Sequence, residues 1–306
     1  MANVLSVEKR SQVVRCLVEG NSIRATVRMT GAAKNTVVKL LADLGSACAK
    51  YQDKVMRDLS CERIQCDEIW SFVYAKRARV PEEKQGQFGY GDVYTWVAID
   101  ADTRLVVTYL VGERTHADAK FFMQDLASRL AGRVQLTTDA YRGYPPAVVN
   151  AFGKNGVDFA TVIKIFGRDP LDDDYYKPAE CQGEIIRRKS GRPDPKHVST
   201  SYVERNNLTM RMGMRRFTRL TNAFSKKVEN LAHAVSLHFM HYNFCKVHQT
   251  LKTTPAMRAG LTDHVWTIEE VLGLLANQGP KTGGRRSHGL KPKKLVAERQ
   301  RIRRAN

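Results

Sequence analysis

The chain of 306 residues is long enough for one large domain or two smaller ones with a substantial apolar core. Its 42% hydrophobic and 26% charged residues are typical of a globular protein rather than a disordered one, and no apolar run reaches the roughly 18 residues that a membrane helix requires. The 50 Lys and Arg outnumber the 31 Asp and Glu and give a net charge of +19, which indicates a polyanionic partner such as nucleic acid.

Residues 1–46 are predicted to form an all-α helix-turn-helix domain. Three helices are expected, over 7–18, over 23–29 after the capping residue Ser22, and over 33–44 before a terminating Gly45. A Gly-containing turn at 30–31 joins the second helix to the third, as in helix-turn-helix proteins. The third helix would then present four polar side chains to a DNA major groove, namely Lys34, Asn35, Thr36 and Lys39. An ordinary helical hairpin is the alternative.

A mixed sheet with helices on its faces is predicted for the middle of the chain. After a helical linker over 47–62, the apolar patterning favours strands at 64–74, 94–100 and 105–112, a helix at 116–130, a strand at 134–138, a helix at 144–152 and a strand at 159–166. Three antiparallel strands followed by alternating helices and strands predict an α/β fold.

The rest of the chain, from residue 167 onward, is predicted to contain an insertion, three helices and a basic tail. Residues 167–200 contain four prolines and the Asp run 172–174, and we expect an inserted surface loop or subdomain there. Helices are expected over 201–220, 222–244 and 268–275. Residues 277–306 are rich in Gly, Lys and Arg and are predicted to be a disordered basic tail.

The positive charge gathers at the start of the chain, in a late helical region and in the tail. Residues 1–50 carry a net charge of +5, and residues 205–258 and 281–306 each carry +9, so the rest of the chain is slightly acidic. Such a pattern is expected if the flanks contact phosphates and the middle holds catalytic carboxylates. The cysteines form no C-x-x-C pair, which argues against structural zinc, and their scatter without a signal peptide predicts a cytoplasmic protein.

Three carboxylates are the candidate chemical groups. Asp67 interrupts an otherwise apolar strand, where a carboxylate is costly unless it is paired, protonated or metal-bound. Asp139 follows the carboxyl end of a strand, the edge at which ligands gather in open α/β sheets. Glu204 lies on a helix that could reach the same edge. Hard oxygen ligands suit Mg²⁺ or Mn²⁺, and two such ions support phosphodiester cleavage.

Other acidic residues could compete for these roles. Glu180 and Glu184 are alternatives to Glu204 as the third ligand, whereas the Asp run 172–174 is interpreted as a solvated loop. Glu68 follows Asp67 directly and is expected to face the opposite side of the strand.

Several blocks, in the same order, resemble the DDE transposases of the IS1 type. They are DEIW at 67–70 with VYAK at 73–76, GERT at 112–115, TDAYRGY at 138–144, VERNN at 203–207, SKKVE at 225–229 and YN at 242–243. The resemblance covers about residues 64–255 without 167–200. The 64 residues between Asp139 and Glu204 are a wider spacing than in the best-known members, and this sequence lacks the zinc-finger cysteines of some members.

The resemblance implies an RNase H-like catalytic domain over 63–258, with the insertion 167–200, followed by a C-terminal helix within 259–276. Asp67, Asp139 and Glu204 would be the catalytic and metal-binding residues, with two Mg²⁺ (or Mn²⁺) ions per site and no small-molecule cofactor. It implies double-stranded DNA, as element ends and target, and a homo-oligomer in a synaptic complex associated with a prokaryotic nucleoid. Expected DNA contacts in the basic region are Arg205, Asn207, Arg211, Arg215, Arg216, Lys226 and Lys227.

The expected function is therefore a DNA transposase. It would cleave a strand at each element end and transfer the freed 3′-hydroxyl into target DNA. A catalytically inactive or domesticated transposase that acts as a sequence-specific DNA-binding regulator is the alternative, and a structure-selective nuclease is a third possibility.

Overall fold

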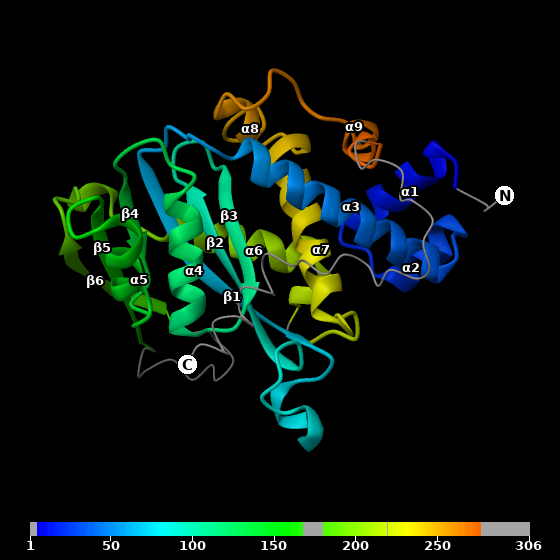
Figure 1. The fold of residues 1–306 in the computed structure, drawn as a ribbon, viewed down its shortest axis with the longest axis horizontal. Coiled ribbons are helices and arrows are strands. Elements are labelled where there is room, and N and C mark those ends of the chain that lie inside the picture. Colours follow the sequence, from blue (N-terminus) through cyan, green and yellow to red (C-terminus); the bar gives the residue numbers. More distant parts are fainter. Residues whose placement is uncertain (1–4, 168–179, 219, 277–306) are drawn as a thin grey trace.

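The computed structural model describes residues 5–167, 180–218 and 220–276. A sheet with helices packed against it lies on one side of the molecule, and a group of helices that includes both early and late parts of the chain lies on the other (Figure 1). The long helix α3 runs between the two sides (Figure 1). No helix among the described residues combines the length and the apolar character needed to span a membrane.

The first two helices have close to their expected bounds. Helix α1 spans Val7–Val18, and α2 spans Ile23–Thr30. The Ser22 hydroxyl accepts a hydrogen bond from the Ala25 amide at 3.1 Å, so it caps α2 as expected. Gly31 ends α2 with a φ of +67°, a conformation that glycine adopts without steric cost.

The third helix does not end at Gly45, and that expectation is wrong. Helix α3 spans Lys34–Val55 without interruption. Gly45 lies where α7, Val228–Met240, crosses α3, and a Cβ at this position would lie 2.5 Å from the His233 carbonyl oxygen. The Ser236 hydroxyl also donates to the Gly45 carbonyl at 2.8 Å. The glycine therefore permits close packing of two helices and does not terminate one.

The sheet has six strands in the order β3-β2-β1-β4-β5-β6. Its strands are β1 Arg63–Val73, β2 Gly91–Asp100, β3 Val106–Gly112, β4 Gln135–Thr138, β5 Asp158–Gly167 and β6 Glu180–Ser190. The β1–β2 and β2–β3 pairs are antiparallel, β4 is parallel to both β1 and β5, and β6 is antiparallel to β5. The predicted mixed α/β sheet is therefore confirmed.

Three helices accompany this sheet, namely α4 His116–Ala127, α5 Tyr144–Phe152 and α6 Ser201–Gly213. The shorter helical elements of the described chain are η1 Arg77–Arg79, η2 Glu82–Lys84, η3 Pro195–His197, η4 Arg215–Phe217, η5 His241–Cys245, α8 Pro255–Arg258 and α9 Ile268–Gly273. Helices α4 and α5 pack against each other, and α6 packs against β1 and β2.

Two late segments differ from the expected structure. Part of 167–200 forms β6, in which Ile185 pairs with Ile163 of β5, so this part is a sheet strand rather than a surface loop. The Asp run 172–174 lies outside the described residues. The helix expected over 222–244 begins only at Val228, and an irregular basic segment separates it from α6. The predicted disordered tail, 277–306, also lies outside the described residues.

One continuous apolar core joins the helices to the sheet. It includes Val14 of α1, Leu44 of α3, Trp96 of β2 and Phe239 of α7, each of them fully buried. The N-terminal helices therefore pack on the same core that supports the sheet edge where β1 and β4 meet.

Candidate metal centre

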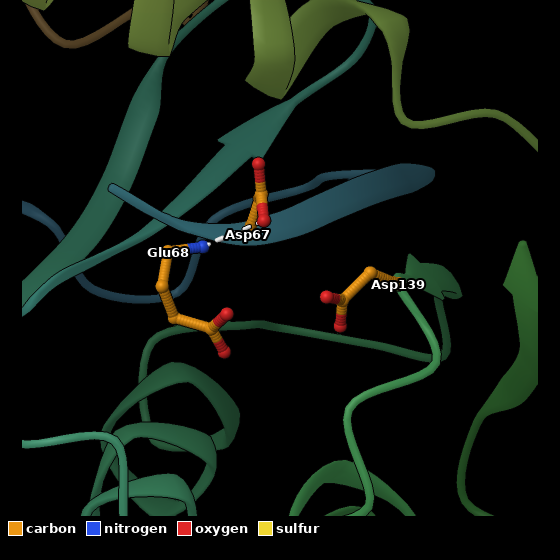
Figure 2. Close-up of side chains that lie close together, drawn as sticks. All are labelled: Asp67, Glu68 and Asp139. Carbon is orange, nitrogen blue, oxygen red and sulfur yellow. Dashed lines mark hydrogen bonds between the residues drawn. The ribbon is translucent and has the colours of Figure 1, made fainter. Parts of the chain in front are cut away.

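The parallel pairing of β1 with β4 brings two of the predicted carboxylates together. Cys66 of β1 pairs with Thr138, the last residue of β4, so the next residue on each strand is Asp67 or Asp139. Carboxylate oxygens of Asp67, Glu68 and Asp139 all lie within 4.8 Å of one another. Asp67 and Glu68 extend from opposite sides of β1, and Asp139 lies beside them at the end of the neighbouring strand (Figure 2).

Asp67 is held by hydrogen bonds from its own strand and from α6. Its two carboxylate oxygens accept from the Glu68 amide and from the Asn207 side-chain amide, each at 2.8 Å. Burial raises the pKa of Asp67 to about 6, and the negative charges of Asp139 and Glu204 add to this effect, while the two hydrogen bonds oppose it. A bound cation would relieve the same electrostatic cost.

Glu68 is the third acid of the cluster, and its carboxylate approaches from the other side of the strand. Its side chain is only 2% exposed, and its Oε1 atom has no hydrogen-bond partner in the described structure. Burial raises the pKa of Glu68 to about 8, with a further contribution from the charge of Asp139. An unpartnered oxygen on a buried acid is unfavourable unless a proton or a cation satisfies it.

Arg114 supplies positive charge between two of the three acids. Its Nη2 atom lies 3.1 Å from Asp139 and 3.3 Å from Glu68. Its guanidinium stacks over the Tyr141 ring, 4.5 Å from the ring centre, and the Tyr141 amide donates to Asp139 at 2.9 Å. The short turn after β4 thus fixes both Asp139 and the arginine that faces it.

Glu204 lies near this cluster but outside it. Its Oε2 atom is 2.5 Å from the ammonium group of Lys164 on β5, and its Oε1 atom accepts from the Thr200 hydroxyl at 2.7 Å. Asn207, one turn further along α6, does reach Asp67. The structure therefore brings the helix of Glu204 to the site, while the Glu204 carboxylate pairs with a lysine.

Neither Glu180 nor Glu184, the alternatives to Glu204 as third metal ligand, is found in the acidic cluster of the described residues. Glu184 on β6 lies 3.9 Å from the same Lys164 ammonium group and is not among the clustered acids. The side chain of Glu180 lies outside the part of the chain that can be described.

The cluster of Asp67, Glu68 and Asp139 could hold a metal ion. It offers three carboxylate groups, which are the hard oxygen ligands preferred by Mg²⁺, Mn²⁺ and Ca²⁺. The acids carry more negative charge than the single guanidinium of Arg114 can balance at neutral pH. The open edge of the sheet where β1 and β4 diverge is also the usual position for a ligand of an α/β fold.

The residues expected to contact DNA have different surroundings. Eight of them are exposed, namely Lys34, Asn35, Lys39, Arg205, Arg211, Arg215, Lys226 and Lys227. Thr36 and Arg216 are half-buried. Asn207 is buried and bonds to Asp67, so it orients a carboxylate instead of presenting its amide to a polymer at the surface.

Sequence reasoning missed the roles of three residues. Glu68 was expected on the far side of its strand, and it does extend that way, but the length of its side chain allows it to reach Asp139 at the strand end. Arg114 belongs to the GERT block without any assigned role. Lys164 had no sequence signal, because it faces Glu204 only through the pairing order of β1, β4 and β5.

No protein-family model matches the sequence, and the curated proteins contain no significant match to it.

Proposed function

We propose that the protein is a DNA transposase of the DDE type. Asp67, Asp139 and Glu204 would hold two Mg²⁺ (or Mn²⁺) ions at the sheet edge. The observation that carries the proposal is the meeting of Asp67, within β1, and Asp139, just after the end of the adjacent parallel strand β4, with the helix of Glu204 bonded to Asp67 through Asn207.

The sheet topology supports this proposal. Three antiparallel strands with β4 and β5 added parallel to β1 are compatible with an RNase H-like fold, which the resemblance to IS1-type transposases implies. Helices α2 and α3, joined by a turn at Gly31, are compatible with a helix-turn-helix. The +19 charge suits a double-stranded DNA substrate, either element ends or target.

Glu204 would join the site by exchanging its partner. Its pairing with Lys164 is an ion pair between partly exposed groups, which contributes little stability, so a divalent cation at Asp67 could compete for the carboxylate. Glu204 is already close enough for its charge to raise the pKa of Asp67. We expect a change of the Glu204 side-chain rotamer to bring its carboxylate toward Asp67.

The chemistry would follow from the placement of these groups. Asp67, Asp139 and Glu204 would hold divalent ions, which would supply activation of an attacking water or 3′-hydroxyl and charge stabilisation for the leaving oxygen. Asn207 holds the Asp67 carboxylate in one orientation, and the turn amide of Tyr141 does the same for Asp139. Arg114 lies where it could also contact a phosphate, because its side chain is 38% exposed.

A second candidate function is sequence-specific DNA binding without catalysis. The Glu204 carboxylate forms an ion pair with Lys164 and does not join the two aspartates, which favours this second function. In that case Asp67, Glu68 and Asp139 would bind a cation without cutting DNA.

The test uses isosteric variants of the two aspartates. Linear duplexes that contain the DNA sequences on either side of the coding gene are incubated with the full chain and either Mg²⁺ or EDTA. Asp67→Asn and Asp139→Asn should each lower cleavage by more than about 100-fold, beyond the loss typical of residues that only support a metal ligand, and DNA binding should persist. The exposed Asp58→Asn should cut at the wild-type rate. Wild-type cleavage by both site variants would disprove the proposal, and metal-dependent binding without any cleavage by the wild type would favour the regulator.

A further inference from the structure

A large basic pocket lies away from the carboxylates, between the early helices and the segment that precedes α7. Its volume is about 950 Å³. One wall contains Arg24, Arg28 and Lys34 of α2 and α3, and the facing wall contains Arg215, Arg216 and Lys226. These two walls are nearly 200 residues apart in sequence, and the packing of α3 against α7 brings them together (Figure 1).

The pocket contains cations without counter-charges. No carboxylate is present among its described lining residues, and its other polar groups are amides and hydroxyls such as Asn35, Asn230 and Ser225. His238 also lines it, but burial lowers the pKa of this histidine to about 3, so it is neutral. Six positive charges around one cavity repel one another, and a bound polyanion would remove that repulsion.

Arg216 is the least solvated of these cations. Its Nη1 atom donates to the Ser225 hydroxyl at 2.6 Å, a neutral partner. Burial lowers the pKa of Arg216 to about 10, which shows that its environment disfavours the charged form. Arginine remains protonated at neutral pH even so, and a guanidinium fork is well matched to phosphate oxygens.

The two walls are fixed relative to each other by a close backbone contact. Gly20, in the turn between α1 and α2, has a φ of +80°, and a Cβ there would lie 2.6 Å from the Gly213 carbonyl oxygen at the end of α6. The irregular basic segment starts directly after Gly213. The turn that contains Gly20 and the start of the segment that contains Arg215 and Arg216 therefore lie against each other beside the pocket.

We infer that this pocket binds consecutive phosphates of a DNA backbone, independently of base sequence. The choice of DNA as the source of the phosphates rests on the proposed function. A volume at the upper end of the range for small-molecule sites exceeds the needs of a single phosphate, and cations on two facing walls suit a chain of them. The pocket lies between the predicted recognition helix α3 and the segment that directly follows α6, the helix of Glu204. One DNA molecule could therefore contact the pocket and also reach the carboxylates.

The salt dependence of DNA binding tests this inference. Fluorescence anisotropy of a duplex of arbitrary sequence is measured with the full chain, in EDTA, over a range of KCl concentrations. Arg24→Gln with Lys226→Gln removes one exposed cation from each wall. The slope of log K against log salt should fall by about 1.8, because each phosphate contact contributes about 0.9. Arg216→Gln alone should lower it by about 0.9.

A matched control removes the same charge elsewhere. Lys54→Gln with Lys120→Gln neutralises two exposed lysines of α3 and α4 outside the pocket and should leave the slope nearly unchanged. An equal loss in this control, or an unchanged slope in the Arg24/Lys226 variant, would overturn the inference. That double variant changes only exposed side chains, so it remains informative if Arg216→Gln does not fold.

A second arm distinguishes DNA from free polyphosphate. Tripolyphosphate binding is measured by calorimetry on the same variants. If the pocket variants lose tripolyphosphate binding but keep the DNA slope, the pocket binds a free polyphosphate and the DNA assignment is wrong. A reduced slope in a protein that never cleaves DNA would support the pocket and count against the transposase, so the two proposals fail separately.

Discussion

The carboxyl side chain of Glu68 is only 2% exposed and lies next to Asp139 and Arg114. Its raised pKa means that the folded protein binds this proton more tightly than the unfolded chain does. The stabilising contribution of the neutral acid is therefore complete below about pH 4.5, its ordinary value, and is lost as the pH rises toward 8. A bound cation would offset that loss.

We expect Glu68→Gln to change how stability depends on pH. In metal-free protein the variant should gain about 2–4 kcal/mol relative to wild type between pH 5 and pH 8, because each unit of pKa shift corresponds to about 1.4 kcal/mol. Urea unfolding at several pH values in EDTA measures the difference. The exposed Glu82→Gln should show no such trend, and a pH-independent difference for Glu68→Gln would contradict the account of this buried acid.

Lys164→Met should release Glu204. Removing an ammonium group 2.5 Å from the carboxylate frees Glu204 for a cation at Asp67. We expect Mg²⁺ to bind about 3- to 10-fold more tightly, equivalent to roughly 1 kcal/mol. Calorimetric titration measures this, and Lys189→Met on the exposed strand β6 is the control. Unchanged or weaker Mg²⁺ binding would show that Glu204 is not a ligand.

The sequence allowed the two aspartates to be found, because strand signals place Asp67 within one strand and Asp139 at the end of another. It could not reveal how Glu204 is paired. That pairing depends on which strand lies next to β4, and only the folded sheet brings Lys164 of β5 opposite α6. Likewise, the Glu68 carboxylate comes close to Asp139 because β4 ends beside it. The alternation of side chains along β1 alone does not show where the neighbouring strand ends.

At the scale of elements, Gly45 shows that the same residue type can end a helix or permit a close contact. Gly31 has the left-handed φ of a helix terminus, whereas Gly45 continues α3 beneath α7. Local sequence does not separate these cases, since the partner helix lies almost 200 residues away. Strand β6 was missed for a related reason, because its pairing with β5 is visible only in the sheet.

Gly45→Ala should therefore destabilise the protein, although alanine favours helix. The added methyl group would lie 2.5 Å from the His233 carbonyl oxygen, so α3 and α7 must separate. Overpacking of this kind costs about 1–3 kcal/mol, which exceeds the gain in helix propensity of up to about 1 kcal/mol. Thermal unfolding measures the change. Gly273→Ala at the end of α9, where an added Cβ would meet no atom from elsewhere in the fold within 4 Å, should be neutral or stabilising. Equal effects at both sites would refute the packing argument.

At the scale of the whole molecule, the shared apolar core predicts that helices and sheet unfold together. Val14 of α1 and Trp96 of β2 belong to one buried cluster. Calorimetry should show a single transition with equal calorimetric and van't Hoff enthalpies. Val14→Ala, which removes buried methyl groups, should shift that transition as a whole to lower temperature. Two resolved transitions, or one that splits in the variant, would mean that the N-terminal helices form an independent unit.

The backbone contact between Gly20 and Gly213 has a consequence for how DNA would be measured. Because the turn after α1 lies against the end of α6, we expect α2 and α3 to move together with the helix of Glu204. If α3 reads DNA bases as we propose, the distance from α3 to the carboxylates would then be fixed. A transposase with such a fixed distance would cleave at a set length of duplex from the recognised sequence. If a few base pairs were inserted between that sequence and the element end, the cut would stay at the same distance from the recognised sequence and would shift relative to the element end by the length of the insertion.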